Sequence, residues 1–338
     1  MRAVGFTESR PADDPRALED LTLPEPEPAE HDLLVDVEAV SVNPVDTKVR
    51  LGSPPTDGQP RVLGWDASGT VKAVGPAVTL FKPGDRVWYA GSIARPGCDS
   101  ERHVVDERIA GPHPRTLAAA EAAALPLTSI TAWELLFDRL NFVEGQGEGL
   151  SLLVVGAAGG VGSILVQFAR TLTKATVIGI ASRPETAEWV KALGAHHVID
   201  HARPLSAELK RIGIPAVTHA ASLTRTDLHY AELVESLAPQ GRLGLIDDPP
   251  TLDAKKLKRK SLSLHWELMF TRPLFGTPDL VEQHRLLVRV AQMVDAGRLK
   301  TTLGEHYGRI NAANLRRAHA LVESGRARGK IVLEGFGE

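Results

Sequence analysis

The chain has 338 residues, of which 43% are hydrophobic and 24% charged, and this composition is typical of a globular protein large enough for two domains. The formal net charge of −3 offers no general attraction to nucleic acid or to an anionic membrane, so we expect neither as a partner. The single cysteine, Cys98, excludes an intrachain disulfide and a metal site built from several cysteines. Because the first residues lack an apolar core of signal-peptide length, we expect a cytoplasmic protein.

The first 124 residues predict a β-rich domain. Strand patterns occur at residues 33–40, 69–74 and 84–89, and proline and glycine separate them. Short strands of this kind indicate a small barrel or sandwich. The composition becomes alanine-rich near Ala118, and helical spacing follows at residues 128–140, so we place a domain boundary in this region.

From residue 152 onward, strands and helices alternate. The pattern predicts helices between successive strands, and repeated βα units imply a parallel sheet with helices on both faces. The strands are expected at residues 152–155, 175–181, 197–199, 216–221 and 242–247, and the helices at residues 160–172, 184–193, 204–211 and 226–237.

Beyond about residue 250 the alternation stops. Residues 255–260 are strongly basic, which we interpret as a solvated surface loop or helix in preference to a polyanion site. Two amphipathic helices are predicted at residues 279–296 and 311–323, followed by a final strand at 330–333. We expect this tail to pack on the first domain. The predicted organisation is one domain of residues 1–124 and 266–338, and a second of residues 125–265.

The most informative stretch is residues 152–170, where four apolar residues lead into the turn GAAGGVG and then a helical pattern. A strand, a glycine turn and a helix together hold a dinucleotide pyrophosphate, since the helix start offers free N–H groups. Residues 149–169 carry no charge and are just long enough to span a bilayer, but their glycines and strand-like start argue against a membrane helix. The predicted phosphate-contacting residues are Ala158, Gly159, Gly160, Val161 and Gly162.

The end of the second strand selects the cofactor in such a fold. A carboxylate there binds the ribose hydroxyls of NAD, whereas this chain has Ser182 and Arg183 and no acid. Because a guanidinium matches a phosphate group well, the pattern favours NADPH. The alternative is that Arg183 is only a solvated residue at a helix start.

Five segments of the chain recur in one protein family in the same order. They are SVNPVDTK at residues 41–48, LGWDASG at 63–69, GDRV at 84–87, ALPLT at 124–128 and AAGGVG at 157–162. On these segments the chain resembles the medium-chain dehydrogenase/reductase superfamily, in its quinone-oxidoreductase-like branch. The tail, with GKIVL at 329–333, resembles a subgroup called zinc-type alcohol dehydrogenase-like.

The resemblance implies an α/β fold with a GroES-like β-rich catalytic domain and a Rossmann domain that has a doubly wound parallel sheet. It also implies NADPH-dependent reduction of a quinone or an α,β-unsaturated carbonyl, and it suggests a homodimer. Ala157 replaces the usual first glycine of the phosphate turn, which this branch commonly shows. By family position, Asn43, Thr128 and Lys330 contact the cofactor. Ser222, Ile246 and His201 follow strands of the second domain, where loops face the ligand.

The chain lacks the residues that bind zinc in zinc alcohol dehydrogenases. Zinc alcohol dehydrogenases carry a cysteine near the position of Asn43 and Gly-His-Glu where this chain has Gly64, Trp65 and Asp66. Their structural zinc needs four clustered cysteines, and this chain has Cys98 alone. Zinc needs at least three suitably placed ligands, so we expect no metal.

Each predicted catalytic residue also has a structural interpretation. Asn43 contacts nicotinamide ribose or substrate oxygen, or is a turn asparagine before Pro44. Asp46 has a catalytic role, or forms a surface pair with Lys48. Thr128 lies near the nicotinamide, or caps a helix.

Four aromatic or histidine side chains complete the predicted site. Tyr89 and His103 are candidate proton donors, and either can instead be an ordinary strand or core-edge residue. Trp65 and Trp88 are candidates for the apolar wall of an acceptor pocket, and core packing is the alternative.

The leading hypothesis is a zinc-independent, NADPH-dependent quinone or enone reductase. Two alternatives stay open: a zinc-free carbonyl or alcohol dehydrogenase, and a non-catalytic NADPH-binding redox sensor. A short-chain reductase is excluded by pattern, because none of the three tyrosines has a lysine four residues later.

Overall fold

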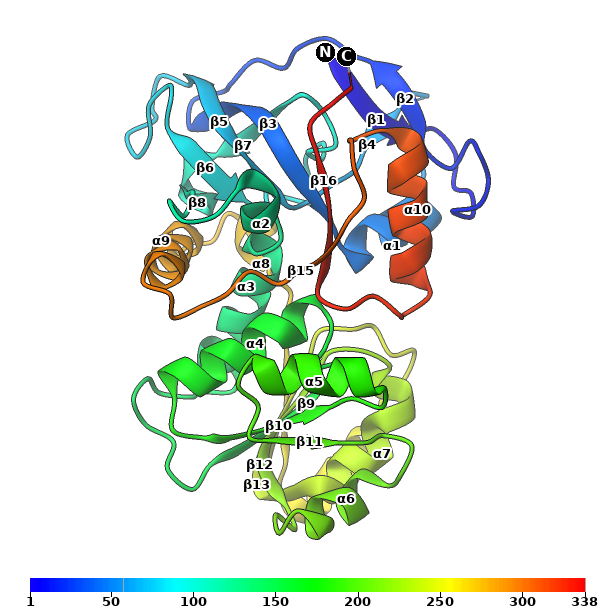
Figure 1. Ribbon diagram of the computed structural model, residues 1–338, viewed down its shortest axis with the longest axis vertical. Coiled ribbons are helices and arrows are strands. Elements are labelled where there is room, and N and C mark those ends of the chain that lie inside the picture. Colours follow the sequence, from blue (N-terminus) through cyan, green and yellow to red (C-terminus); the bar gives the residue numbers. More distant parts are fainter. Residues whose placement is uncertain (57, 338) are drawn as a thin grey trace. The chain divides into compact units, whose positions relative to one another are not determined.

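The computed structural model describes residues 1–56 and 58–337, and the chain divides into two compact units (Figure 1). The first unit contains Met1–Ile130 and Phe270–Glu338, and the second contains Thr131–Met269. The first is rich in β-strands and the second has a parallel sheet, which confirms the predicted α/β class. Within the described part of the chain, every helix is too short or too polar to cross a membrane.

The first unit is organised around one long strand, β3 (Asp32–Val42), which is buried over most of its length. It pairs antiparallel with β5, β7 and β16, and its sheet runs in the order β15-β16-β3-β5-β6-β8. A second sheet has the order β2-β1-β4. The other strands are β1 (Arg2–Phe6), β2 (Glu19–Thr22), β4 (Arg61–Val62), β5 (Ala67–Val74), β6 (Arg86–Tyr89), β7 (Arg102–Asp106), β8 (Ala110–Pro112), β15 (Leu303–His306) and β16 (Lys330–Glu334).

The carboxyl-terminal strand β16 brings the end of the chain beside its beginning. Ile331 pairs with Val42, so Lys330 reaches the end of β3, where α1 (Pro44–Gly52) starts. Figure 1 shows the red β16 among the blue and cyan strands. The helices of this unit are α1, η1 (Glu107–Ile109), α2 (Ala119–Ala123), α3 (Pro126–Trp133, which runs past its boundary), α8 (Thr271–Phe275), α9 (Glu282–Asp295) and α10 (Ala312–Glu323).

The second unit has a parallel sheet in the order β11-β10-β9-β12-β13-β14. Leu153 and Ile178 belong to a core cluster with Leu205 and Leu233 of α6 and α7, on one face. On the other face, a Cβ at Gly179 would lie 2.4 Å from Val190 of α5, so that helix packs closely. The elements are β9 (Ser151–Val155), α4 (Gly160–Leu172), β10 (Thr176–Ile180), α5 (Pro184–Ala192), β11 (His197–Ile199), α6 (Leu205–Arg211), β12 (Val217–Ser222), α7 (Thr226–Ser236), β13 (Leu237–Leu245) and β14 (Ser263–Trp266).

Three elements in or beside the second unit differ from the sequence prediction. Strand β13 begins at Leu237 instead of residue 242, because Gln240 has a φ of 65° and a register irregularity lets the strand continue through Pro239. The edge strand β14 was not predicted. The expected helix 128–140 is divided into α3 and a π-helix, η2 (Glu134–Arg139).

The basic run forms a 3₁₀-helix, η3 (Ala254–Lys260), whose cationic side chains are exposed except for Lys260. The Lys260 ammonium donates to the carbonyl oxygens of Val234 at 3.1 Å, Glu235 at 2.6 Å and Leu237 at 2.9 Å. These carbonyls lie at the end of α7, where no N–H group of the helix is left to bind them. One lysine of the run therefore caps a helix.

We predict that Lys260→Met lowers the free energy of unfolding by about 1–2 kcal/mol, because it removes a charged donor from three carbonyls. Lys256→Met is the matched control, since Lys256 is exposed on the same short helix, and we expect it to change stability by less than about 0.5 kcal/mol. Urea unfolding measures both variants. Equal stability of the two would contradict the capping role.

Candidate functional site

The glycine turn of the second unit links β9 to α4. Gly156 has a φ of 76°, and a Cβ added to it would lie 3.0 Å from Thr224. Helix α4 begins after Gly159 without a side-chain cap or an acidic residue in its first turn. Residues 158–161 are half-exposed. The first N–H groups of α4 are therefore available to an anion.

Gly162 fits the close packing that such a turn requires. A Cβ there would lie 2.2 Å from the carbonyl oxygen of Gly156 and 2.6 Å from the Cα of Ala157. Only glycine lets the helix start sit this near the turn. The turn therefore fits the pyrophosphate of a nicotinamide dinucleotide.

Ser182 and Arg183 are exposed directly after β10, where Arg183 is the residue before α5. The Nε atom of Arg183 lies 3.4 Å from Oε1 of Glu185, and the side chain stays 43% exposed. His201 is exposed in the turn after β11, with its ring 5.8 Å from that of His229. Arg183 thus has the exposure that a contact with a cofactor phosphate needs.

The carboxyl ends of β12 and β13 are tied together by a polar chain. Ser222 is fully buried, and its hydroxyl lies 2.7 Å from that of Thr226. The hydroxyl and the N–H of Thr226 donate to the carboxylate of Asp247. Ile246 is half-buried beside Asp247. Ser222 therefore fixes the shape of this edge, and its hydroxyl is already bonded.

In the first unit, Asn43 and Lys330 meet Asp66 in a buried cluster. The Lys330 ammonium donates to the backbone carbonyl of Val42 at 2.9 Å and to Oδ1 of Asn43, and it lies 3.1 Å from Oδ2 of Asp66. The amide of Asn43 donates to the same Asp66 oxygen at 3.1 Å and to the carbonyl of Ser41 at 3.2 Å. The Asn43 amide is thus fully engaged.

Burial works against both charges of this cluster. Burial raises the pKa of the Asp66 carboxyl and lowers the pKa of the Lys330 ammonium, and the attraction between the two groups opposes each shift. Because each charge lies beside its partner, the pair replaces the solvation that burial removes.

Asp46 lies next to this cluster at the start of α1. Its Oδ2 atom accepts the backbone N–H of Asn43 at 2.6 Å, and the residue is 1% exposed. The interpretation of Asp46 and Lys48 as a surface pair is therefore wrong. Burial raises the pKa of Asp46 to about 7, and the nearby Asp66 adds to this while Lys330 opposes it.

Thr128 lies inside α3, and its hydroxyl donates to the carbonyl of Leu125 at 3.1 Å. The capping interpretation of Thr128 is therefore wrong, because a cap accepts from the helix N–H groups. Asp66 takes that role instead, since its Oδ1 accepts the N–H of Leu127 at 2.9 Å. Asp66 thus connects the start of α3 to Asn43 and Lys330.

Tyr89 and His103 form a separate buried pair. The His103 ring stacks on Tyr89, its Nε2 lies 3.0 Å from the carbonyl of Pro96, and its Nδ1 lies 3.1 Å from the Tyr89 hydroxyl. A carbonyl only accepts, so Nε2 carries the proton and Nδ1 accepts from Tyr89. Burial lowers the pKa of His103 to about 4 and raises that of Tyr89. Both side chains therefore stay neutral near pH 7.

The two candidate tryptophans are buried. Trp65 donates from Nε1 to the carbonyl of Ser92 at 3.0 Å and packs edge-on against Phe270. Trp88 is fully buried in β6, where a Cβ at Gly111 would lie 2.8 Å from its Nε1. Both side chains pack in the core of the first unit, and their contact with substrate stays a prediction.

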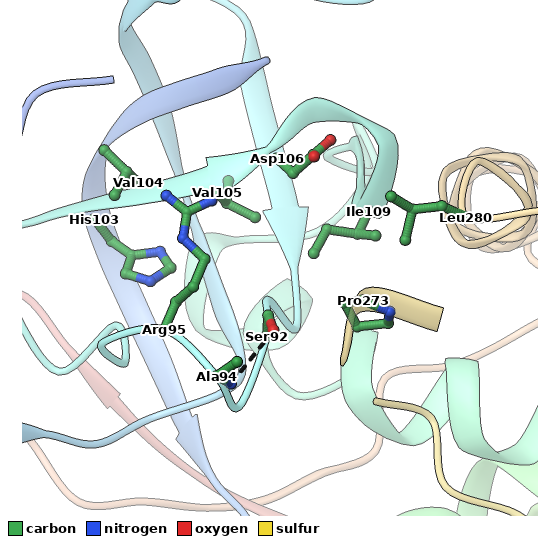
Figure 2. A pocket seen from close by; sticks show the side chains of 10 residues that line it. All are labelled: Ser92, Ala94, Arg95, His103, Val104, Val105, Asp106, Ile109, Pro273 and Leu280. Carbon is green, nitrogen blue, oxygen red and sulfur yellow. Dashed lines mark hydrogen bonds between the residues drawn. The ribbon is translucent and has the colours of Figure 1, made fainter. Parts of the chain in front are cut away.

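A cavity of about 240 Å³ opens near the loop that follows β6 (Figure 2). Its polar side includes Ser92, Arg95, neutral His103 and Asp106. The Arg95 guanidinium binds both oxygens of Asp32 at 2.7 and 2.8 Å, and Asp106 forms an ion pair with Arg108. Because Asp32 balances Arg95, the lining favours a molecule without net charge. The apolar side is formed by Val105, Ile109, Pro273 and Leu280.

Comparison with known proteins identifies the class. Residues 29–128 match the family model of the alcohol dehydrogenase GroES-like domain, and residues 193–333 match that of the zinc-binding dehydrogenases. A zinc-type alcohol dehydrogenase-like protein of Staphylococcus aureus is 38% identical over 98% of this chain and 99% of its own.

Two solved structures extend this finding. A Rhizobium etli protein that carries a zinc-dependent alcohol dehydrogenase label is 60% identical, with a TM-score of 0.96 over 100% of this chain and 99% of that chain. Escherichia coli quinone oxidoreductase, in complex with NADPH, is 25% identical, with a TM-score of 0.84 over 99% of this chain and 100% of that chain.

The fold, the phosphate turn and these relatives define a nicotinamide-dependent oxidoreductase. The chain belongs to the medium-chain dehydrogenase/reductase superfamily, in its quinone-oxidoreductase-like branch, with a GroES-like and a Rossmann unit.

The names of several relatives imply zinc, and the donor set here does not fit it. The oxygens of Asn43 and Asp66 surround the Lys330 ammonium, a fixed cation that repels a second one. Within residues 1–56 and 58–337, no group of three or more histidine, cysteine, aspartate or glutamate side chains can hold a metal ion.

Sequence reasoning did not assign Asp66, Glu134 and Glu267 to the site, although all are buried acids. The signal for Asp66 was present, because an acid followed Trp65 in an apolar segment where zinc enzymes carry Gly-His-Glu. Glu134 and Glu267 had no such signal, since one occurs in an apparently regular helix and the other beyond the predicted strands.

We predict that Asp46→Asn flattens the pH dependence of stability. A carboxyl whose pKa is raised from 3.8 to about 7 stabilises the fold fully below pH 4, and this stabilisation is lost as the pH rises through 7. The wild-type free energy of unfolding should fall by roughly 1.4 kcal/mol per pH unit inside this window from this group. Asparagine still accepts the Asn43 N–H and has no proton to lose. Denaturant unfolding between pH 4 and 8 measures both proteins, and parallel curves would contradict the assignment.

Proposed function

We propose that this chain is a zinc-independent reductase that transfers hydride from NADPH to a quinone or an α,β-unsaturated carbonyl. The observation that carries the proposal is the exposed Ser182 and Arg183 after β10, without an acid at the strand end. The Lys330 cluster supports the zinc-independent part, because it places a permanent cation among the oxygens that a metal would need.

Bound NADPH would supply the hydride, and the chain supplies binding and charge. The free N–H groups at the start of α4 bind the pyrophosphate, and Arg183 binds the 2′-phosphate. In the first unit, Lys330 fixes Asn43 and Asp66 beside the start of α3, and Asp66 balances its charge. Asn43 and Asp66 in turn hold the Lys330 ammonium in one place. We propose Thr128 and Asp46 as further residues of this site.

We propose that the acceptor binds in the cavity near the loop after β6, which limits its size and charge. Its volume of about 240 Å³ admits one or two rings, and its neutral lining disfavours a charged acceptor. A small quinone or an aryl enone fits these conditions better than a long acyl chain or a carboxylate.

We also propose a cytoplasmic homodimer. Strand β14 is the outer strand of its sheet, and Trp266 at its end is 50% exposed, with Leu268 beyond it 53% exposed. A strand edge next to exposed apolar side chains is a favourable surface for a second copy.

We predict that Arg183→Ala weakens NADPH binding about ten-fold or more and changes NADH binding less than about two-fold, because only NADPH carries the 2′-phosphate. Fluorescence titration measures both dissociation constants. Arg203→Ala is the matched control, since Arg203 is an exposed arginine of the same unit with a side chain 67% exposed. Equal losses for both cofactors would show that Arg183 does not contact the phosphate.

We predict that the purified protein oxidises NADPH with 1,4-benzoquinone or 1,4-naphthoquinone at a kcat/KM at least about 100-fold above that for oxidation of ethanol with NADP. The reason is that an electron-poor acceptor needs no Lewis acid to activate it. Steady-state absorbance at 340 nm with a panel of quinones, enones, ketones and alcohols measures this. Tight NADPH binding without turnover of any acceptor would favour the redox sensor instead.

A further inference from the structure

Two acidic side chains of the second unit are buried against each other outside the phosphate turn. Glu134 is the first residue of η2 and is 1% exposed, and Glu267 follows β14 and is 3% exposed. Burial raises the pKa of Glu267 most, and the charge and side-chain contact of Glu134, where η2 packs on β14, raise it further. Two carboxylates cannot share a hydrogen bond without a proton, because both are acceptors only. The contact therefore requires that one of the two acids is protonated.

The charges around the pair fit one proton. The Nε atom of Arg139 donates to Oε2 of Glu267 at 2.8 Å, and within the described residues Oε1 of Glu267 receives no hydrogen bond unless a proton on Glu134 supplies it. One arginine and two carboxyls that share a proton have no net charge. Burial, together with the negative charge of Glu134, raises the pKa of Glu267 to about 9, and Arg139 opposes the shift.

Few other charges approach the pair. Glu134 and Arg139 of η2 are the charged groups that act on Glu267. On the neighbouring strands, Arg242 of β13 acts on His265 of β14. Burial lowers the pKa of His265, and the charges of Arg242 and Arg139 lower it further. The titration of the pair near pH 9 therefore depends on the charges of Glu134 and Arg139 in η2.

The pair lies at the carboxyl end of the parallel sheet, near the predicted cofactor loop. The N–H of Glu267 donates to the carbonyl of Leu245 at 2.9 Å, which continues the pairing of β14 with β13 to the carboxyl end of the sheet. Ile246, a predicted cofactor contact, is the next residue after Leu245. Ligands of open parallel sheets bind at this edge. Glu267 therefore stands beside the loop that faces the cofactor.

Helix η2 also packs against this end of the sheet. A Cβ at Gly244 would lie 2.6 Å from Leu135, so η2 packs directly on β13. Its π-helical turn is of a kind that occurs mostly at functional sites. The chain enters the second unit at Thr131, shortly before Glu134, and leaves it after Met269, shortly beyond Glu267. The pair thus connects the first and last segments of the unit.

We propose that Glu134 and Glu267 are positioning residues that share one proton and, with Arg139, fix η2 to the carboxyl end of β14, which holds the loop after β13 in its cofactor-binding shape. Loss of the shared proton leaves two buried negative charges against one arginine, and their repulsion separates η2 from the strand. Binding of the nicotinamide cofactor then weakens as the pair ionises. The cofactor readout rests on the proposed function, whereas the ionisation of the pair does not.

The test is Glu134→Gln in the full-length protein. Glutamine donates a hydrogen bond to the Glu267 carboxylate and has no proton to lose, so the variant keeps the contact at all pH values. We expect the NADPH dissociation constant of the variant to match that of the wild type within about two-fold at pH 7.5. Between pH 7.5 and 10, it should rise about five-fold or more in the wild type and stay nearly constant in Glu134→Gln. Glu235→Gln, on the exposed side of α7, is the matched control and should follow the wild type.

Thermal unfolding without cofactor reads the same ionisation independently. Since the folded pKa of Glu267 is raised to about 9, its stabilising effect is full at low pH and is lost as the pH rises through 9. In Glu134→Gln, we expect no such loss of stability near pH 9. Glu134→Ala removes the contact, and we expect NADPH binding to weaken about ten-fold at pH 7.5 with little change in the acceptor KM. If Glu134→Ala fails to fold, the Glu134→Gln profiles decide alone.

Three outcomes overturn the proposal. Identical pH profiles of the wild type and Glu134→Gln would show that no shared proton is present. A flat wild-type NADPH profile, or normal NADPH binding by Glu134→Ala, would show that the pair does not position the cofactor loop. The absence of turnover with every acceptor would instead refute the proposed reductase, and both pH profiles would still test the pair.

Discussion

The first unit depends on one buried cation. Lys330 is delivered by the last strand of the chain to the end of β3, where its ammonium meets Asn43 and Asp66. Asp66 in turn accepts from the first turn of α3. A single ammonium therefore links three segments that are distant in sequence, and each segment needs the others because an unpaired charge here would be buried without solvent. This arrangement also explains why the chain keeps the fold of zinc enzymes without their donor set.

Much of the fold could be predicted from the sequence because its periodicities are strong. The parallel sheet followed from apolar strands separated by helices of regular length, and the glycine turn was placed on the correct strand and helix. The errors occurred where local signals were weak. Strand β13 passes through Pro-Gln-Gly because the partner strand tolerates an irregularity there, and β14 has only partly buried residues on an edge. The apolar residues at 132, 133, 136, 137 and 140 have the sequence spacing of an α-helix, so the wider turn of η2 left no trace in the pattern.

The site was harder to predict because its contacts depend on distant residues. Asn43 was assigned to the site from its motif, but the sequence did not show that its amide is fully occupied by Lys330 and Asp66. Tyr89 and His103 were considered separately as proton donors, and the structure shows that each satisfies the other in a buried pair. Burial and pairing determine whether a polar residue is available for chemistry, and neither can be read from a local pattern.

The two units solve the same physical problem in different ways. In the first, a lysine ammonium compensates the buried Asp66, and the neighbouring Asp46, whose pKa is raised to about 7, titrates near neutrality. In the second, two carboxyls lie beside one arginine, so neutrality requires a proton as well. A carboxyl proton is lost as the pH rises, whereas a carboxylate beside an ammonium opposes the loss of the ammonium proton. On the proposed role of the pair, the second cluster makes its strand edge sensitive to alkaline pH, whereas the first keeps the Lys330 charge paired with Asp66.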